Sequence, residues 1–288
     1  MSTMYSAKKT LPFRIELIRQ LRRRRTLVAY ILMVALPVIV VAAVKFGPSS
    51  SSDGAAANNN GFGSGSLNLI GLATSGAWNF TLVMILFASG FLLTTVFALF
   101  CGDTVASEAS WSTLRYLLAA PIPRRRILRV KLAVGMFLSL GALITLLVTS
   151  YLIGWIAFGN QALTSPLGGS FEGTEAFGRV VIIGAYVFTT LLVTIGVAFL
   201  MSVVTDVPLG AVGTAVMIVI ISGILDAIEA LGSLREWLPS HYGRSWTDSL
   251  NSVINWNGMA RGSAYALVVF AALVGIAFIK FDRKDITS

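Results

Sequence analysis

The sequence predicts an all-α integral membrane protein with six transmembrane helices and both termini in the cytoplasm. Three observations carry this prediction. Of the 288 residues, 56% are hydrophobic and only 12% are charged, whereas soluble domains carry about 25% charged residues. Six apolar segments are each long enough to cross a bilayer core, which needs about 20 helical residues. Lys and Arg gather in alternate connections between these segments, as is typical of cytoplasmic loops.

Residues 1–26 are predicted to form a cytoplasmic amphipathic helix that lies flat on the membrane interface. Helical spacing places its apolar side chains on one broad face, and these are Leu11, Ile15, Leu17, Ile18 and Leu21. The four consecutive arginines that follow, Arg22, Arg23, Arg24 and Arg25, are expected to reach anionic headgroups of the inner leaflet. A topology signal alone explains these arginines equally well.

Residues 27–288 are predicted to form one six-helix transmembrane domain. Its spans are expected at about residues 27–46, 79–101, 132–158, 180–204, 209–228 and 262–281. None of these segments carries a charged residue through its middle. Gly and Pro recur within them, which membrane helices tolerate and soluble helices generally do not.

The distribution of Lys and Arg predicts the orientation. Residues 1–26 hold eight of them, the connection 102–131 holds six, and the tail from Lys280 holds three. The other side holds five, which are Lys45, Arg179, Arg235, Arg244 and Arg261. This asymmetry places both termini and the connection 102–131 in the cytoplasm. The net charge of +9 is therefore assigned to membrane orientation, and no nucleic-acid partner is expected.

The outer loop, residues 229–261, is rich in aromatic residues. Trp237, Tyr242 and Trp246 alternate with short apolar patches around Pro239, a pattern typical of short re-entrant or interfacial helices in the headgroup layer. We expect these three aromatic residues to be candidates for an outer gate or lid. An interfacial anchor with no gating role is an equal alternative.

Several kinds of catalytic chemistry have no motif in this chain. There is no G-x-x-x-x-G-K-[ST] phosphate loop, and His241 and Cys101 are the only histidine and the only cysteine. The apolar segments also lack the acids and bases at mid-depth that ion-coupled carriers need. We therefore expect no catalytic residue, no cofactor and no metal in this chain. Energy for uphill transport would have to come from a partner.

Segment 102–123 is the strongest candidate for contact with such a partner. In the stretch "GDTVASEASWSTLRYLL", helical spacing places Glu108, Trp111 and Arg115 on one side. An adjacent apolar face holds Leu114, Leu117 and Leu118, and Pro121 and Pro123 end the helix. Such an edge can fit into a groove on another protein. A solvated loop that carries cytoplasmic positive charge is the alternative.

The stretch "SEASWSTLRYLLAAPIPRRRILRVKL", residues 107–132, resembles the cytoplasmic signature of ABC-2-type permeases, the type-2 class of ATP-binding-cassette exporters. In that signature, a helical segment and a proline–arginine turn precede the third span. The matching positions are Glu108, Ser112, Thr113, Leu114, Arg115, Leu117, Leu118, Pro121, Pro123, Arg124 and Lys131. Ser112 stands where glycine is frequent in the family, which is a mild departure.

The resemblance implies a function and a set of partners. It implies that segment 102–123 is the coupling helix, seated against a separate ATPase subunit that binds ATP and magnesium. The implied coupling residues are Glu108, Trp111, Leu114, Arg115, Leu118, Pro121 and Arg124. A second permease copy or a paralogous permease would complete the exporter, in contact with membrane lipids. The resemblance places the chain in the cytoplasmic membrane of a prokaryote as a multi-pass subunit.

The cargo is not specified by the sequence. Spans without mid-depth charge favour a hydrophobic or amphipathic molecule, such as a drug, an antibiotic or a lipid, and a hydrophilic polymer is the alternative. Two other functions stay open as well. The chain can be an ion- or proton-coupled secondary carrier, or a non-transporting membrane anchor for a cytoplasmic protein.

Overall fold

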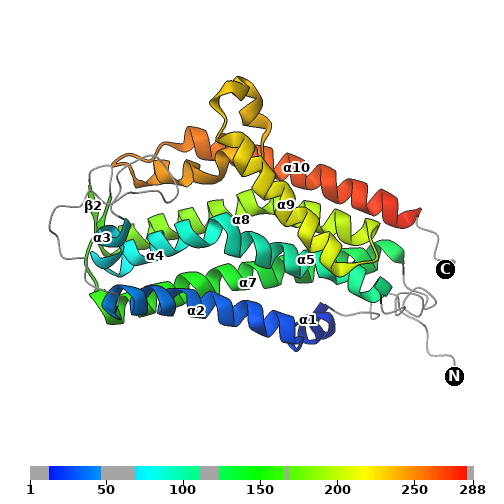
Figure 1. The fold of residues 1–288 in the computed structure, drawn as a ribbon, viewed down its shortest axis with the longest axis horizontal. Helices are drawn as coiled ribbons and strands as arrows, with labels where there is room; N and C mark the ends of the chain where they lie inside the picture. Colours follow the sequence, from blue (N-terminus) through cyan, green and yellow to red (C-terminus); the bar gives the residue numbers. More distant parts are fainter. Residues whose placement is uncertain (1–12, 47–68, 111–122, 166–168, 284–288) are drawn as a thin grey trace.

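The computed structural model describes residues 13–46, 69–110, 123–165 and 169–283, and it is almost entirely helical. Six helical segments within these ranges are long and apolar enough to span a membrane. They run side by side in one elongated bundle (Figure 1), as the hydropathy pattern predicts for a multi-pass membrane protein.

The described elements follow one another along the chain as a short helix, six spans and small connecting elements. The first part of the chain holds α1 (Phe13–Leu21), α2 (Arg24–Phe46), α3 (Leu69–Thr74), α4 (Ala77–Phe87), the π-helical turn η2 (Ala88–Leu92), α5 (Leu93–Ser110) and α7 (Arg124–Phe158). The remainder holds β1 (Leu163–Thr164), β2 (Ser170–Phe171), α8 (Gly173–Val204), α9 (Pro208–Asp226), the 3-10 helices η3 (Glu229–Trp237) and η4 (His241–Leu250), and α10 (Trp256–Asp282).

Most of the long helices extend beyond the predicted apolar segments. The second span, α4–η2–α5, is continuous from Ala77 to Ser110, and the third, α7, starts at Arg124. Residues 102–110 therefore continue the second span and do not start a separate helix. The apolar run of the sequence indicates the part of a helix that is expected to contact lipid. The helix itself continues through its backbone hydrogen bonds until a cap or a proline ends it.

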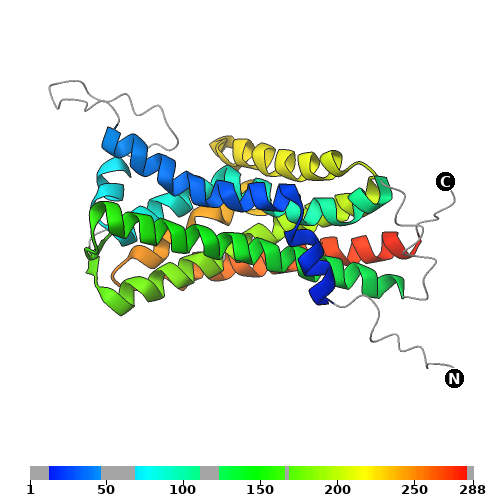
Figure 2. The ribbon, with the colours of Figure 1, turned by 90° about the horizontal axis from the view of Figure 1, so that it is seen from below.

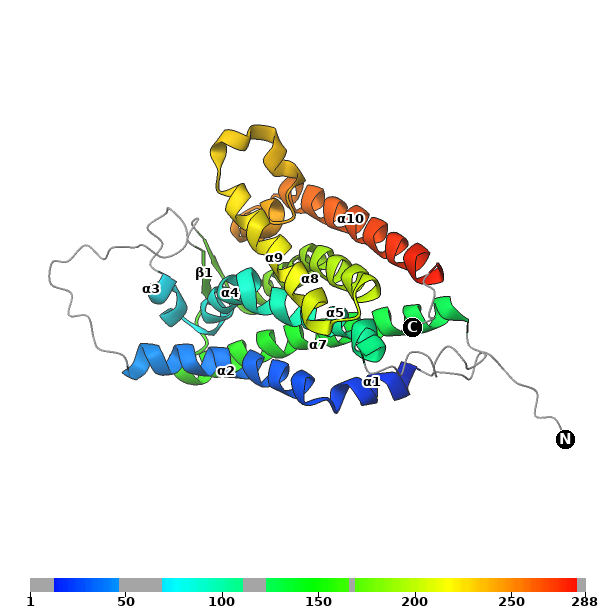
Figure 3. The same ribbon diagram turned by 45° about the vertical axis from the view of Figure 1, so that its right-hand side comes forward.

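The core lies around α5 and α8, which pack against each other and against most other spans. Figure 3 shows these two helices in the middle of the bundle, with α7, α9 and α10 around them. The first span, α2, lies on the outside against α7 (Figure 2). α5 and α7 pack closely, since a Cβ on Gly135 would lie 2.7 Å from Cys101 Sγ. Glycine at position 135 therefore allows the two backbones to approach.

The two ends of the bundle differ in character. The α1 end carries α1, the end of α5, the start of α7 and the end of α10, whereas the β-hairpin end carries α3, the two short strands and the start of α8 (Figure 1). At the β-hairpin end, the fully buried Asn79 accepts a hydrogen bond from Thr164 N (3.2 Å) and donates to Ser75 Oγ. This amide fastens the hairpin to α4.

Candidate functional site

Buried charged residues gather at the α1 end, where three elements that are distant in sequence come together. We define the Lys131 cluster as Glu16 and Arg19 on α1, Glu108 on α5 and Lys131 on α7. Glu16, Glu108 and Lys131 are each no more than 3% exposed. Charged residues this deeply buried are rare unless they are paired. The contacts among the four side chains of the cluster therefore account for this burial.

The ammonium of Lys131 lies at the centre of the cluster. Its Nζ is 2.8 Å from Glu108 Oε2 and donates a hydrogen bond to the backbone oxygen of Thr104 at 2.8 Å. The same atom lies 3.9 Å from Glu16 Oε1. An ammonium has three donors and no acceptor, so Lys131 joins two carboxylates and one helix carbonyl. It links α7 to α5 and to α1.

The residues of α1 complete the cluster through helical spacing. Arg19, three residues after Glu16, donates to Glu16 Oε1 at 2.8 Å and also to Glu108. Gln20 donates to Glu16 Oε1 at 3.1 Å. Burial raises the pKa of Glu16, but the charge of Lys131 and the hydrogen bonds from Arg19 and Gln20 outweigh it, so the pKa of this carboxyl lies below its ordinary value. Burial lowers the pKa of Arg19, and its two carboxylate partners raise it above its usual range.

A second group of charges, centred on Asp103 of α5, holds the joint between α1 and α2. Arg23 donates to Asp103 Oδ2 at 2.8 Å and to Ser107 Oγ at 3.2 Å, and Arg25 donates to Asp103 Oδ1. Burial lowers the pKa of Arg23, with Asp103 offsetting only part of the effect. The start of α2 is therefore ionically attached to α5.

Two stripes on α5 make both groups possible. Asp103 and Ser107 are four residues apart and face Arg23, whereas Lys131 contacts the Glu108 carboxylate and the main-chain oxygen of Thr104, each one position further on. This i, i+4 spacing puts each pair on one side of the helix. The polar stripes are visible in the sequence, and polar residues in the continuation of a span are expected to face other protein groups.

The structure corrects the expected position of Glu108. Its carboxylate is 3% exposed and contacts Arg19 and Lys131 within the chain. Arg124 is exposed, and it donates to Asp282 O at 3.4 Å. The other predicted coupling residues, Trp111, Leu114, Arg115, Leu118 and Pro121, lie outside the described residues. The docking role of segment 102–123 stays a prediction.

The four predicted headgroup arginines divide into two pairs. Arg22 and Arg24 are exposed, whereas Arg23 and Arg25 turn to Asp103.

The exposed and buried faces of α1 differ in polarity. Large apolar side chains on α1 are exposed, namely Phe13, Ile15, Ile18 and Leu21, while Glu16 and Gln20 are buried. An apolar face turned away from the bundle suits an interfacial helix.

The predicted gate residues differ in their exposure. Trp237 is 77% exposed, Tyr242 is partly exposed and Trp246 is buried. Backbone groups of the loop are held by the spans, because Tyr186 Oη donates to Tyr242 O at 2.7 Å and Tyr265 Oη donates to Trp237 O at 2.6 Å. Only Trp237 of the three has a largely free side chain. Whether the loop gates a pathway stays a prediction.

Arg179 is a structural residue that the sequence analysis treated only as an outer charge. This buried guanidinium donates to the backbone oxygens of Ser249 and Asn251 and pairs with Glu175 Oε1 at 3.0 Å. It also lies 3.5 Å from the ring centroid of Phe171, a favourable cation–π geometry. It thereby fastens the end of η4 to α8.

The junction of η3 and η4 lies partway along the bundle. Tyr186, which binds Tyr242 O, is 13 residues after the start of α8, or about 20 Å along a helix that rises 1.5 Å per residue. Figure 1 shows η3 projecting sideways between α9 and α10, at a distance from the β-hairpin end. No residue of η3 is buried.

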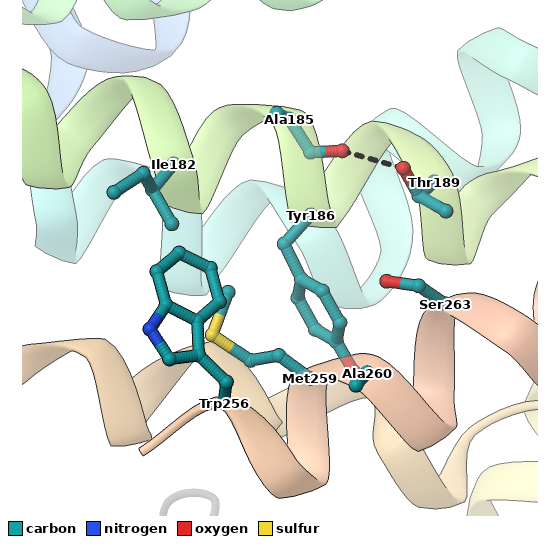
Figure 4. Close-up of a pocket in the computed structure, with 8 residues that line it drawn as sticks. All are labelled: Ile182, Ala185, Tyr186, Thr189, Trp256, Met259, Ala260 and Ser263. Atoms are coloured by element: carbon teal, nitrogen blue, oxygen red, sulfur yellow. Dashed lines mark hydrogen bonds between the residues drawn. The ribbon is translucent and has the colours of Figure 1, made fainter. Parts of the chain in front are cut away.

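A cavity of about 280 Å³ opens between α8 and α10 beside this junction. Figure 4 shows its lining, which is mostly apolar and consists of Ile182, Ala185, Tyr186, Thr189, Trp256, Met259, Ala260 and Ser263. Two of its hydroxyls already donate to backbone oxygens, Thr189 to Ala185 and Tyr186 to Tyr242. Among the described residues, no three His, Cys, Asp or Glu side chains gather as metal ligands.

The fold places the chain among multi-pass helical membrane proteins with a buried ionic cluster at one end of the bundle. A family model described as "Protein of unknown function (DUF2705)" matches residues 57–287, and the chain belongs to this family. A search of curated proteins gives no match. The description of the family names no activity, so the function has to be argued from the residues.

Proposed function

We propose that this chain is the transmembrane permease subunit of an ATP-binding-cassette exporter. A separate ATPase subunit would bind ATP and magnesium and drive efflux of a hydrophobic or amphipathic substrate, such as a drug, an antibiotic or a lipid-like molecule. The chain itself would catalyse no reaction. It would lie in the cytoplasmic membrane of a prokaryote with both termini in the cytoplasm.

The observation that carries the proposal is where the described flanks of the exporter-like stretch lie. Its described flanks, the end of α5 and the start of α7, lie side by side at the α1 end. The basic residues of α1, of the start of α2 and of the start of α7 lie at the same end. A coupling segment in this position would meet a cytoplasmic ATPase exactly where positive charge is expected to face the cytoplasm.

The distribution of charge within the spans favours an external energy source. In the six described spans, the ionisable Asp, Glu, Lys and Arg residues lie toward the helix ends, and the buried ones at the α1 end, Asp103, Glu108 and Lys131, each have a charged partner. An ion-coupled carrier is expected to hold acids or bases along its pathway at mid-depth. ATP hydrolysis by a partner therefore explains the sequence better than ion coupling does.

The exposed η3 favours a second permease copy, or a paralogous permease, as a further partner. This 3-10 helix exposes Glu229 and Glu236 partway along the bundle. Irregular backbone and charged groups at membrane depth are tolerated where protein or a water-filled path covers them. A facing permease would supply both the cover and the other wall of a central path.

The proposal can be tested with the purified chain and any ABC ATPase that is encoded next to it. The chain alone should hydrolyse no ATP, and the co-purified complex in nanodiscs should hydrolyse it. Changing the phosphate-loop lysine of the ATPase to alanine should abolish both hydrolysis and efflux. ATP turnover or pumping by this chain without a second polypeptide would refute the proposal.

The same assays separate the two alternative functions. Efflux that survives loss of ATP and stops when the ion gradient collapses would identify a secondary carrier. Efflux that is unchanged after deletion of the chain, with no ATPase recovered, would identify a membrane anchor.

A further inference from the structure

A single ammonium connects three elements at the α1 end. Lys131 of α7 contacts Glu108 and the Thr104 carbonyl of α5, and it lies beside Glu16 of α1. Arg19 also links α1 to α5, because it forms ion pairs with both Glu16 and Glu108. We propose that Lys131 is a positioning residue that makes α1 move as one body with the adjacent ends of α5 and α7.

Stability alone is a weak reason to keep such a cluster. Replacing a buried ion pair by well-packed apolar residues is often neutral or stabilising. The surrounding spans already provide an apolar interior, with Ile127 and Leu128 of α7 fully buried one turn before Lys131. Directional ion pairs instead select one relative position of the helices, which is the best-attested use of buried polar groups.

The attachment of α1 to the bundle depends heavily on these charges. Its residues Ile15, Ile18 and Leu21 are exposed, so they contribute little to docking. Leu17 packs partly against the core and Phe13 meets Phe137 edge to face at 6.0 Å between ring centroids. The buried face of α1 is formed by Glu16 and Gln20. Loss of the ammonium should therefore loosen α1 more than any other element.

Backbone groups at the end of α5 also form hydrogen bonds to side chains of neighbouring helices, which restrain this end from bending by itself. Lys131 holds Thr104 O, and Ser202 Oγ of α8 accepts hydrogen bonds from Val105 N and Ala106 N at 3.0 Å each. Asp103 binds Arg23 and Arg25 at the α1–α2 joint. A displacement of α5 is thereby passed to α1 and onward to α2.

The inference rests on the proposed function in one respect, since the partner ATPase would supply the displacement. Amide hydrogen exchange of residues 13–21 reads the coupling without knowledge of the cargo. The experiment compares the complex in nanodiscs with ADP and with a non-hydrolysable ATP analogue. The variants are Lys131→Met and Lys131→Arg. The control is Arg125→Met, also on α7, which breaks the exposed pair (2.8 Å) between Arg125 and Asp282 of α10.

In the wild-type complex and in Arg125→Met, the exchange rate of residues 13–21 should change at least about threefold between the two nucleotides. Lys131→Met should abolish this change while the ATPase still binds, and Lys131→Arg should restore part of it because it keeps the charge. A nucleotide-dependent change that persists in Lys131→Met would overturn the inference and leave the proposed function intact.

Two further outcomes are also decisive. Should the wild-type chain bind no ATPase, the proposed function fails, and the chain alone tests the inference: Lys131→Met should speed exchange of residues 13–21 about tenfold and leave α10 unchanged, and equal rates would overturn it. If Lys131→Met aggregates, Glu16→Gln provides the same readout, because it leaves the Lys131–Glu108 pair in place.

Discussion

At the scale of the residue, Glu108 is a side chain whose surroundings are set by partners distant along the chain. In the sequence it is an acid three residues before an aromatic residue, on a helical edge suited to docking. In the structure it is 3% exposed and lies between Arg19 and Lys131. Arg19 is 89 positions away along the chain, so no local pattern identifies this partner. The residue type and the helical register could be predicted, but the contact could not.

Glu16 gives this cluster a testable pH dependence. Its pKa lies below the ordinary value of 4.5, so ionisation stabilises the folded chain above pH 4.5, and this contribution is lost as the pH falls through the folded-state pKa. At pH 7, Glu16→Gln should lower the free energy of unfolding by about 1–3 kcal/mol, because charged partners lose their acceptor.

Thermal unfolding of the detergent-solubilised chain between pH 7 and pH 3 measures this effect. The difference between wild type and Glu16→Gln should shrink below pH 4.5. Glu236→Gln, at an exposed position of η3, serves as the matched control and should leave the unfolding temperature unchanged. A pH-independent difference for Glu16→Gln would contradict the assignment.

At the scale of the element, each of the six predicted spans overlaps a long apolar helix, and most of these helices continue beyond the apolar run. The third span is predicted from residue 132 and the helix begins at Arg124, because charged residues leave the membrane while helical hydrogen bonding continues. Short elements were harder to predict. The outer loop holds the short helices η3 and η4, and its attachment to Tyr186, Tyr265 and Arg179 depends on spans folded around it.

Gly262 is the position where three of these elements meet most closely. A Cβ there would collide with the Tyr186 hydroxyl and lie 2.7 Å from Tyr242 Cβ, so it would disturb the hydrogen bond from Tyr186 to Tyr242 O. Gly262→Ala should therefore destabilise the chain by about 1–3 kcal/mol, the usual cost of overpacking.

The control lies on the same helix. A Cβ on Gly275 meets no atom within 4 Å, so Gly275→Ala should be neutral or stabilise α10 by about 0.5–1 kcal/mol. Denaturation in detergent compares the two variants. Equal stabilities of Gly262→Ala and Gly275→Ala would show that α8, η4 and α10 do not pack as described.

At the scale of the whole molecule, orientation in the membrane is predicted from charge and can be measured directly. Native Cys101 is fully buried, so the unmodified chain should react with no impermeant thiol reagent. Asn160→Cys, at an exposed position of the β-hairpin end, should be labelled from outside intact cells. Lys280→Cys, exposed at the α1 end, should be labelled only after permeabilisation. The reverse pattern would invert the topology.

Hydropathy alone is enough to identify a multi-pass membrane protein with six helices long and apolar enough to cross the bilayer, because it is a local property that each segment carries whatever its neighbours are. The sequence also located the basic connections. The orientation of the charged side chains, in contrast, follows from the tertiary packing of the helices. Arg23, Arg25 and Lys131 turn inward because carboxylates of α1 and α5 lie within reach once the helices pack, and a buried charge is stable only beside such a partner.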